Sequence, residues 1–239
     1  MQALRIRLYQ NLCNYRREGS FGYVQTYPLP TPSMVRGMVH DILEATEYKK
    51  LKISIQGESE TIITNVQKVY KFDRDPRSRP QNPYIVTVGS STKTVTHGIS
   101  YVDLHVNMRL LLHIMFYEDN DNNIRKLFEK IQQKTLVLGR NEDIALIEDI
   151  KIVELTNFQG RGSPQTKFSM YVLPNALVVP AGTLYKLPFW YDNVNSFNDN
   201  RVFHFVDAFY VDKGVALRRE SVFIDNENGD LICFLESPK

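Results

Sequence analysis

The pattern of apolar and polar residues predicts five β-strands in the first two thirds of the chain. They cover residues 4–8, 51–55, 61–72, 102–117 and 146–155. The fourth stretch is the clearest, because apolar residues occupy every second position from Val102 to Phe116 without a miss. We therefore expect one whole face of that strand to be buried.

Apolar residues recur at helical spacing in two further stretches, residues 31–46 and 122–133, which predicts two amphipathic helices. Thr31 is suited to cap the first helix, with Pro32 at the first helical position, where its missing N–H costs nothing. Either residue of the pair Asn120–Asp121 is suited to cap the second. The two apolar faces consist of Val35, Met38, Val39, Ile42, Leu43, Ile124, Leu127, Phe128 and Ile131.

The order of strand, helix, strand, strand, helix and strand over residues 1–155 is that of the split βαβ, or ferredoxin-like, plan. RNA-recognition modules also use this plan. We therefore expect an α+β fold with a ferredoxin-like domain. One connection, roughly residues 73–101, is longer than compact domains usually allow, so it should be functional or disordered. It contains three prolines, and its basic side chains include Arg74, Arg77, Arg79 and Lys93.

Residues 156–239 have a different pattern, in which short β-prone runs are separated by turn residues. The runs lie near residues 168–173, 183–187, 202–211 and 221–224. We expect a second, smaller antiparallel β domain here, packed on the first. Neither part contains internal repeats or low-complexity tracts.

The composition is that of an ordinary globular protein and excludes several other classes. Of 239 residues, 43% are hydrophobic and 23% are charged, which excludes wholesale disorder. No apolar run approaches the roughly 20 residues of a membrane span, and the N-terminus lacks the apolar region of a signal peptide. Cys13 and Cys233 stand far apart, which excludes a cysteine zinc site and a disulfide framework. We therefore expect a cytoplasmic protein with no membrane association.

The net charge of +2 conceals a difference between the two halves of the chain. Residues 1–110 contain 15 Lys and Arg against 9 Asp and Glu, a balance of +6. Residues 111–239 contain 14 against 18, a balance of −4. The first half is therefore the one suited by charge to a polyanion.

Aromatic and arginine side chains are interleaved in NYRREGSFGYVQTYP and in LPTPSMVRGMV, which follows it. A helix start and a close packing of Gly37 explain the prolines and the glycine. Without such packing, glycine inside a helix costs about 1 kcal/mol against alanine. The interleaving itself suits single-stranded nucleic acid, where bases stack on rings and arginines track phosphates. The residues concerned are Tyr15, Arg16, Arg17, Tyr23, Tyr27 and Arg36.

Signals for catalysis and metal binding are weak, and the common NTPase, zincin and hydrolase motifs are absent. His97 with Lys93 is suited to metal-independent RNA cleavage, as general base and charge stabiliser, but no third partner is evident. His105 and His113 stand about 26 Å apart along one strand, too far to share a metal. Arg140 lies in a glycine turn that can present it to a phosphate or to a partner's carboxylate.

Three features together resemble the Cas-five family of CRISPR-associated proteins, in the RAMP superfamily. The segment NYRREGSFGYVQTYPLPTPSMVRGMVHDIL is similar to the family's N-terminal signature, and Leu138–Gly139–Arg140 before Asn–Glu–Asp is similar to its second marker. The connection at residues 73–101 falls where the family has a β-hairpin thumb. The resemblance covers about residues 1–155, and the TYPLPTPS form is most like the type I-B branch.

The resemblance implies a non-catalytic subunit of Cascade, the surveillance complex that carries a CRISPR RNA in antiviral defence. Its expected partners are the 5′ handle of the CRISPR RNA, the backbone subunit and the large subunit, and we expect no cofactor and no metal. The positions expected at the handle are Tyr15, Arg16, Ser33, Arg36 and Arg140. The positions expected on the thumb, which should reach over the RNA to the backbone subunit, are Arg74, Arg77, Arg79, Lys93 and His97.

Two other interpretations stay open. The type I-C branch of the family is a metal-independent endoribonuclease that uses a tyrosine and an adjacent Lys–His pair. Here Lys93 and His97 are four residues apart, which argues against catalysis. The other interpretation is a small-molecule enzyme on a ferredoxin-like core, which predicts no affinity for RNA. RNA binding should instead weaken with salt, by about 0.7 log unit of K per log unit of salt for each phosphate contact.

Overall fold

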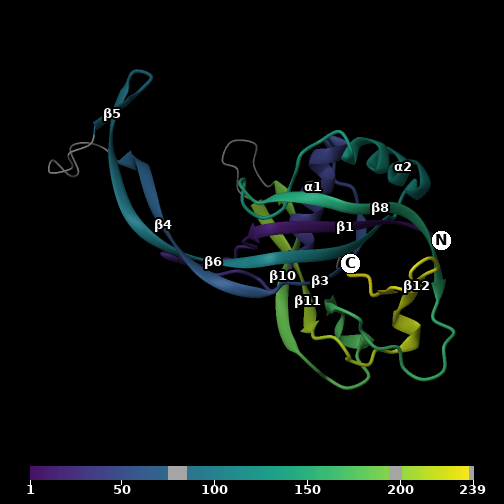
Figure 1. The fold of residues 1–239 in the computed structure, drawn as a ribbon. Coiled ribbons are helices and arrows are strands. Elements are labelled where there is room, and N and C mark those ends of the chain that lie inside the picture. Colours follow the sequence, from purple (N-terminus) through teal and green to yellow (C-terminus); the bar gives the residue numbers. More distant parts are fainter. Residues whose placement is uncertain (75–84, 194–200, 237–239) are drawn as a thin grey trace.

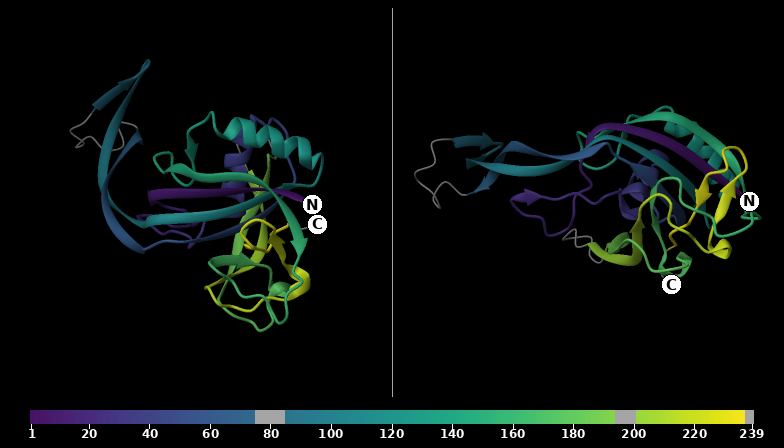
Figure 2. Two further views of the ribbon diagram at one scale, coloured as in Figure 1. Left: turned by 45° about the vertical axis from the view of Figure 1, so that its right-hand side comes forward. Right: turned by 60° about the horizontal axis from the view of Figure 1, so that its bottom comes forward.

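The structure of the chain is a computed structural model that describes residues 1–74, 85–193 and 201–236. A large, mostly antiparallel sheet runs through it, with two helices packed on one face. A long ribbon of strands projects from one side of the body (Figure 1; Figure 2). The mixed helix-and-sheet class expected from the sequence is thus confirmed. No helix in the ranges described here is long and apolar enough to cross a membrane.

The first predicted helix is α1 (Pro32–Leu43), and it begins as expected. The side-chain oxygen of Thr31 accepts a hydrogen bond from the Met34 N–H, and Pro32 lies in the first turn. Gly37 differs from the expectation of close packing, because a Cβ built on it would meet no atom within 4 Å.

The second predicted helix is α2 (Asn120–Ile131), but its N-cap is Asp119, whose side chain makes no capping hydrogen bond. Asn120 Oδ1 instead accepts from the Phe116 N–H at 2.8 Å and ties the start of the helix to the strand before it. The prediction that Asn120 or Asp121 caps this helix is therefore wrong.

Four strands form the centre of the sheet in the order β3-β6-β1-β8, each antiparallel to its neighbour. They are β1 (Gln2–Cys13), β3 (Leu51–Glu58), β6 (Ser91–Phe116) and β8 (Ile144–Asn157). The predicted succession of strands and helices is found as β1, α1, β3, β6, α2 and β8.

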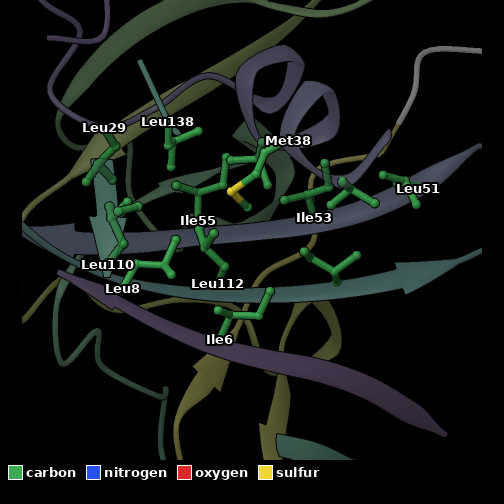
Figure 3. Packing of buried hydrophobic residues seen from close by; sticks show 14 of the residues in the cluster. Ile6, Leu8, Leu29, Met38, Leu51, Ile53, Ile55, Leu110, Leu112 and Leu138 are labelled. Atoms are coloured by element: carbon green, nitrogen blue, oxygen red, sulfur yellow. The ribbon is translucent and has the colours of Figure 1, made fainter. Parts of the chain in front are cut away.

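The main core lies between this sheet and the two helices, and Figure 3 shows its packing. The apolar row predicted on β6 is buried there, with Met108, Leu110, Leu112, Ile114 and Phe116 all at most 3% exposed. Burying one such side chain contributes about 1.5–3 kcal/mol. The helix residues in this core are Val35, Met38, Val39, Ile42, Ile124, Leu127 and Ile131. The apolar faces predicted for both helices are thus confirmed.

β4 (Thr61–Arg74) and the first half of β6 form the ribbon, paired antiparallel from Thr61↔Val106 outward. β5 (Ile85–Val88) pairs with the very start of β6. The connection predicted at residues 73–101 is therefore shorter than expected, since strand pairing resumes at Ile85. The ribbon lacks a face buried against the body over much of its length, so its sequence lacks the alternation that reveals a half-buried strand.

Residues 156–239 continue the same sheet at both edges. β9 (Ser169–Val172) pairs with β3 and is followed by β11 (Arg201–Val211) and β10 (Thr183–Asn193), whereas β12 (Phe223–Asp225) pairs with β8. These four strands correspond to the four predicted runs. The main core includes side chains from β9, β10 and β11, and the division into domains at residue 155 stays a prediction. The shorter elements are β2 (Tyr23–Val24), β7 (Leu136–Val137), β13 (Leu231–Ile232) and 3₁₀ turns at Pro174–Ala176 and Arg219–Ser221.

Candidate nucleic-acid interface

One face of the ribbon gathers apolar, aromatic and basic side chains. Directly paired residues of an antiparallel ribbon share a face with the residues two positions along each strand. The pairs that share this face are Val66↔Tyr101, Lys68↔Ile99 and Tyr70↔His97. We call the surface made by these six side chains the ribbon face.

The ribbon face is exposed although most of its side chains are apolar or aromatic. Ile99 is 70% exposed, Tyr70 51% and Tyr101 49%. An exposed apolar patch of this kind marks a binding surface. Lys68 Nζ lies 5.0 Å from the centre of the Tyr70 ring, and the rings of Tyr70 and His97 are 6.5 Å apart. Rings next to positive charge suit stacked bases and their phosphates.

The loop of residues 14–27 is fixed against the base of the ribbon. Within it, β2 pairs in parallel with Tyr101 and Val102 of β6. The Tyr23 hydroxyl donates to Asp103 Oδ1 at 2.7 Å, which links the loop to the same strand. The loop and the ribbon face therefore form neighbouring surfaces.

Arg16 and Arg17 are exposed on this loop. The Arg16 guanidinium donates to the Ser20 carbonyl at 3.1 Å, and the Arg17 guanidinium lies 5.6 Å from the centre of the Tyr27 ring. Within the described part of the chain, neither arginine is paired with a carboxylate, so both charges are available to a phosphate. Phe21, on the same loop, is 86% exposed.

Tyr15 and Tyr27 were expected to offer faces to bases, but both are buried. Tyr15 has no exposed surface, its hydroxyl donates to Gln10 Oε1 at 2.7 Å, and its ring lies against His105. Tyr27 is 5% exposed, and its hydroxyl donates to Glu18. Burial raises the pKa of both phenols. Both rings are packed inside the protein beneath the exposed residues of the loop, so neither can stack on a base.

Arg140 is held inside its own turn. Its guanidinium donates to Asp143 Oδ1 at 2.6 Å and lies 3.1 Å from Glu142 Oε1. Burial would lower the pKa of Arg140, but these carboxylates raise it. Asp143 is 1% exposed and also accepts from the Asn14 N–H, so the turn is bound to the end of β1. The contact of Arg140 with RNA stays a prediction.

Ser33 and Arg36 lie elsewhere, on α1, where they line a pocket of about 550 Å³ between this helix and the end of β10. Arg36 is only 3% exposed. The residues that line the pocket in the described structure include none from the ribbon face or from the loop of residues 14–27. The structure therefore does not bring Ser33 and Arg36 together with the exposed arginines of that loop.

Of the five residues expected on the thumb, His97 is the one whose side chain is described. Arg77 and Arg79 lie outside the described residues, and Arg74 and Lys93 are described by their backbone alone. Lys93 and His97 are four residues apart on β6, which separates their Cα atoms by about 13 Å. Over the described ranges, no group of three or more His, Cys, Asp and Glu side chains could hold a metal ion.

The sequence pattern did not single out Lys68, Tyr70, Ile99 and Tyr101 as candidate site residues. A signal was present, because Val66, Lys68 and Tyr70 occupy every second position of the strand predicted at residues 61–72. The pairing of β4 with β6 places these side chains on one exposed face of the ribbon, which the sequence of either strand alone does not indicate.

Comparison with known proteins gives a family and a fold. Residues 3–185 match the model of a family described as CRISPR-associated protein (Cas_Cas5). A solved chain of a CRISPR RNA-guided surveillance complex shares the fold, with a TM-score of 0.57 and 14% identity over 90% of this chain and 91% of that chain. A CRISPR protein from Archaeoglobus fulgidus aligns over 100% of both chains at 11% identity, with a TM-score of 0.44. No curated protein matches the sequence.

Proposed function

Because the chain belongs to the Cas-five family of CRISPR-associated proteins, we propose that it is a CRISPR RNA-binding subunit of a type I Cascade surveillance complex. In this role it holds the 5′ handle of the guide RNA and contacts the backbone and large subunits in antiviral defence. The family match over residues 3–185 confirms the resemblance found in the sequence. The fold shared with a chain of a surveillance complex supports the assignment.

The arrangement of the central strands supports a ferredoxin-like plan. In the order β8-β1-β6-β3, all neighbours are antiparallel, and α1 and α2 cover the same face. This is the arrangement of a split βαβ unit. The ribbon is inserted between the second and third strands of that plan, β3 and β6, and we assign it to the thumb of the family.

The ribbon face, next to the exposed arginines, is the observation that carries the proposal. Single-stranded RNA is bound through bases splayed onto rings and through phosphates held by cations. The ribbon face offers Tyr70 and Tyr101 as rings, and the adjoining loop offers Arg16 and Arg17 as cations. We place the RNA across the base of the ribbon, with its phosphates toward the loop.

The basic residues expected on the thumb complete the proposal. We propose that Arg74, Arg77, Arg79 and Lys93 contact the RNA and the backbone subunit of the complex, as the resemblance to the family implies. The balance of +6 over residues 1–110 supports this side of the chain as the RNA side. The balance of −4 over the remaining residues supports protein contacts there.

The proposed subunit is not an enzyme, because Lys93 and His97 do not form an adjacent pair. One observation favours the alternative, a metal-independent endoribonuclease: Tyr70 and His97 face each other across the ribbon, with ring centres 6.5 Å apart. Incubating repeat RNA with the protein in EDTA tests the alternative. Cleavage that His97→Ala abolishes would establish the nuclease, whereas intact RNA supports the scaffold.

RNA binding is tested by titrating the protein with repeat-derived RNA at several salt concentrations. Replacing Arg16 and Arg17 by alanine should reduce the salt slope of log K by about 0.7 for each phosphate that the variant no longer binds. The matched control replaces Arg125 and Lys126, two exposed cations of α2, and should bind like the wild type. Absence of binding, or a response flat in salt, would remove the RNA hypothesis and favour the small-molecule enzyme.

A further inference from the structure

A carboxylate lies on the same side of the ribbon as the ribbon face, where the ribbon joins the body. The pair Thr64↔Asp103 follows the innermost pair of the ribbon face with no register shift between them, so its side chains lie on that side as well. The next residue of β6 on this side, His105, is buried. Asp103 is therefore an acidic group in the path proposed for the RNA.

Two hydroxyl groups fix the position of this carboxylate. The Tyr23 hydroxyl donates to Asp103 Oδ1 at 2.7 Å, and the Thr64 hydroxyl donates to the same oxygen at 2.8 Å. Asn14 Nδ2 donates to the backbone carbonyl of Asp103 at 2.6 Å. These contacts come from β2, from β4 and from the residue after β1, so the carboxylate is held in one orientation before any ligand arrives.

The second oxygen of the carboxylate is free and accessible. Among the described residues, Asp103 Oδ2 accepts no hydrogen bond, and no lysine or arginine nitrogen lies within ion-pair distance of it. It is also absent from the buried polar atoms that lack a partner, so a ligand on the surface can reach it. A carboxylate oxygen accepts about two hydrogen bonds, which leaves Oδ1 saturated and both acceptor sites of Oδ2 open.

Such an oxygen disfavours a phosphate but suits the edge of a base. Its negative charge repels the RNA backbone. Guanine is the RNA base whose Watson–Crick edge places two donors, N1–H and the N2 amino group, side by side. Adenine and cytosine have an acceptor nitrogen beside their amino group, and uracil has a carbonyl on each side of its N3–H. Because hydrogen bonds to an ionised acceptor are about twice as strong as neutral ones, the carboxylate favours guanine.

Exposed rings beside Asp103 can hold such a base. Tyr101 lies two residues away on the same side of β6, about 6–7 Å between Cα atoms, and is half exposed. Tyr23 pairs with Tyr101 across β2 and β6 and is 42% exposed. A base stacked on Tyr101 therefore has its edge within reach of the Asp103 carboxylate.

We propose that Asp103 makes the RNA interface selective for guanine at one position. Its Oδ2 accepts hydrogen bonds from N1–H and from the N2 amino group, while the base stacks on Tyr101. The phosphates lie on the side of Arg16 and Arg17, away from the carboxylate. This inference rests on the proposed RNA-binding function and adds a base preference to it.

Binding of short single-stranded RNAs at constant salt tests the preference. The probes are oligouridylates with one guanosine, one inosine or one adenosine at the central position. The protein should bind the guanosine RNA about 5- to 150-fold more tightly than the adenosine RNA, the usual discrimination of a bidentate base contact. The inosine RNA, which lacks the N2 amino group, should lie between them. This series uses the unaltered protein, so it does not depend on the folding of a variant.

Asp103→Asn removes the charge but keeps an oxygen that can accept from Tyr23 and Thr64. It should abolish the preference for guanosine. The affinity for the adenosine RNA should stay the same or rise, because a group that repels phosphates is gone. The matched control, Asp119→Asn, removes an exposed carboxylate just before α2 and should keep the preference of the wild type. Circular dichroism reports that both variants remain folded.

Two results would overturn this inference while leaving the proposed function in place. The first is equal binding of the guanosine and adenosine RNAs by the wild type. The second is an Asp103→Asn variant that weakens all three RNAs equally, as expected if Asp103 only holds Tyr23 in position. Absence of binding to any of the RNAs would overturn the proposed function and this inference together.

Discussion

Gly139 has a φ of +117°, a backbone conformation that strongly favours glycine. A Cβ at this position would lie 2.7 Å from the Asn14 carbonyl oxygen and 2.7 Å from Asp143 Oδ2. This close approach lets the Asp143 carboxylate accept from the backbone N–H groups of Asn14 and Arg140 together. The glycine of the second sequence marker therefore joins its turn to the end of β1.

Gly139→Ala should lower the free energy of unfolding by about 1–3 kcal/mol, because it adds backbone strain and a steric clash. Gly37→Ala is the matched control. It should leave stability unchanged or raise it by up to about 1 kcal/mol, since alanine favours the helix and nothing crowds the new methyl group. Urea denaturation followed by circular dichroism measures both, and equal stability of the two variants would contradict this account.

Tyr70→Ala should weaken the binding of repeat RNA by about 1–3 kcal/mol, the contribution of one stacked base, which is about 5- to 150-fold in Kd. Thermal stability should not change, because the ring is 51% exposed. The control is Tyr117→Ala, an exposed tyrosine just beyond the opposite end of β6. Filter binding at constant salt measures the affinities. Equal affinity of the two variants would show that the RNA does not cross the ribbon face.

At the scale of the element, β6 lies in two environments. From Leu110 to Phe116 both of its faces are covered, since Leu111, His113 and Met115 on the second face are at most 8% exposed. Its first half belongs to the ribbon. Asn107 marks the boundary with a φ of 51°, and its side chain accepts a hydrogen bond from the Tyr9 hydroxyl.

This division explains which part of β6 could be predicted. Residues 102–117 alternate strictly because one face packs on the main core, whereas residues 91–100 pair with β4 and β5 in the ribbon. A strand without a buried face imposes no alternation on its sequence. α1 was predictable for the opposite reason, because its cap and its apolar stripe are both local features of the sequence.

Replacing residues 67–100 by a two-residue Asn-Gly turn should leave the body folded. Val66 and Tyr101 pair directly, so a short turn can close the remaining hairpin. None of the described residues removed belongs to the three hydrophobic core clusters. We expect an unchanged melting temperature, measured by circular dichroism, and RNA affinity reduced at least about tenfold through the loss of stacking. A non-cooperative melt would show that the ribbon supports the body.

At the scale of the whole molecule, a buried ion cluster joins the start of the chain to its end. Arg5, 3% exposed, donates to Asp225 at 2.8 Å and to Asp149 at 2.9 Å. Burial alone would raise the pKa of Asp225, but contacts from His113, the Glu227 N–H and Arg5 hold it well below its usual value. Burial lowers the pKa of His113, although the neighbouring Asp225 carboxylate opposes this shift.

Stability should fall in two steps on acidification. The neutral imidazole of His113 contributes stability that is fully present above the unfolded pKa of about 6.5 and is lost as the pH falls toward the lower folded pKa. The Asp225 carboxylate contributes stability that is present above about pH 4 and is lost as the pH falls further. Urea midpoints between about pH 8 and pH 3 measure both steps.

Two variants test whether His113 causes the first loss of stability and Asp225 the second. His113→Gln should reduce the first step, leaving the share of His40 and His105, whose pKa values burial also lowers. Asp225→Ala should cost about 3–5 kcal/mol at neutral pH, because it leaves Arg5 buried without its main partner. Glu148→Ala is the control, since its pairing with Arg109 lies at the surface. A urea midpoint independent of pH would contradict the roles given to both groups.

The sequence by itself determined the features that depend on neighbours along the chain. Thr31 and Pro32 start α1, the alternation of residues 102–117 places the central strand, and the order of elements and motifs indicated the family that the match over residues 3–185 confirms. Caps, periodic faces and motifs act within a few residues, so they can be recognised before the fold is known.

Only the tertiary structure decided which of the chemically suitable side chains reach the surface. Tyr15 and Tyr27 have aromatic rings suited to stacking on bases, but other residues cover them. Lys68 and Tyr70 were not predicted as site residues, yet both are exposed. Arg36 faces a pocket whose opposite wall comes from β10, far along the chain. The burial of a side chain depends on which distant segments pack against it, and a local pattern contains no record of those segments.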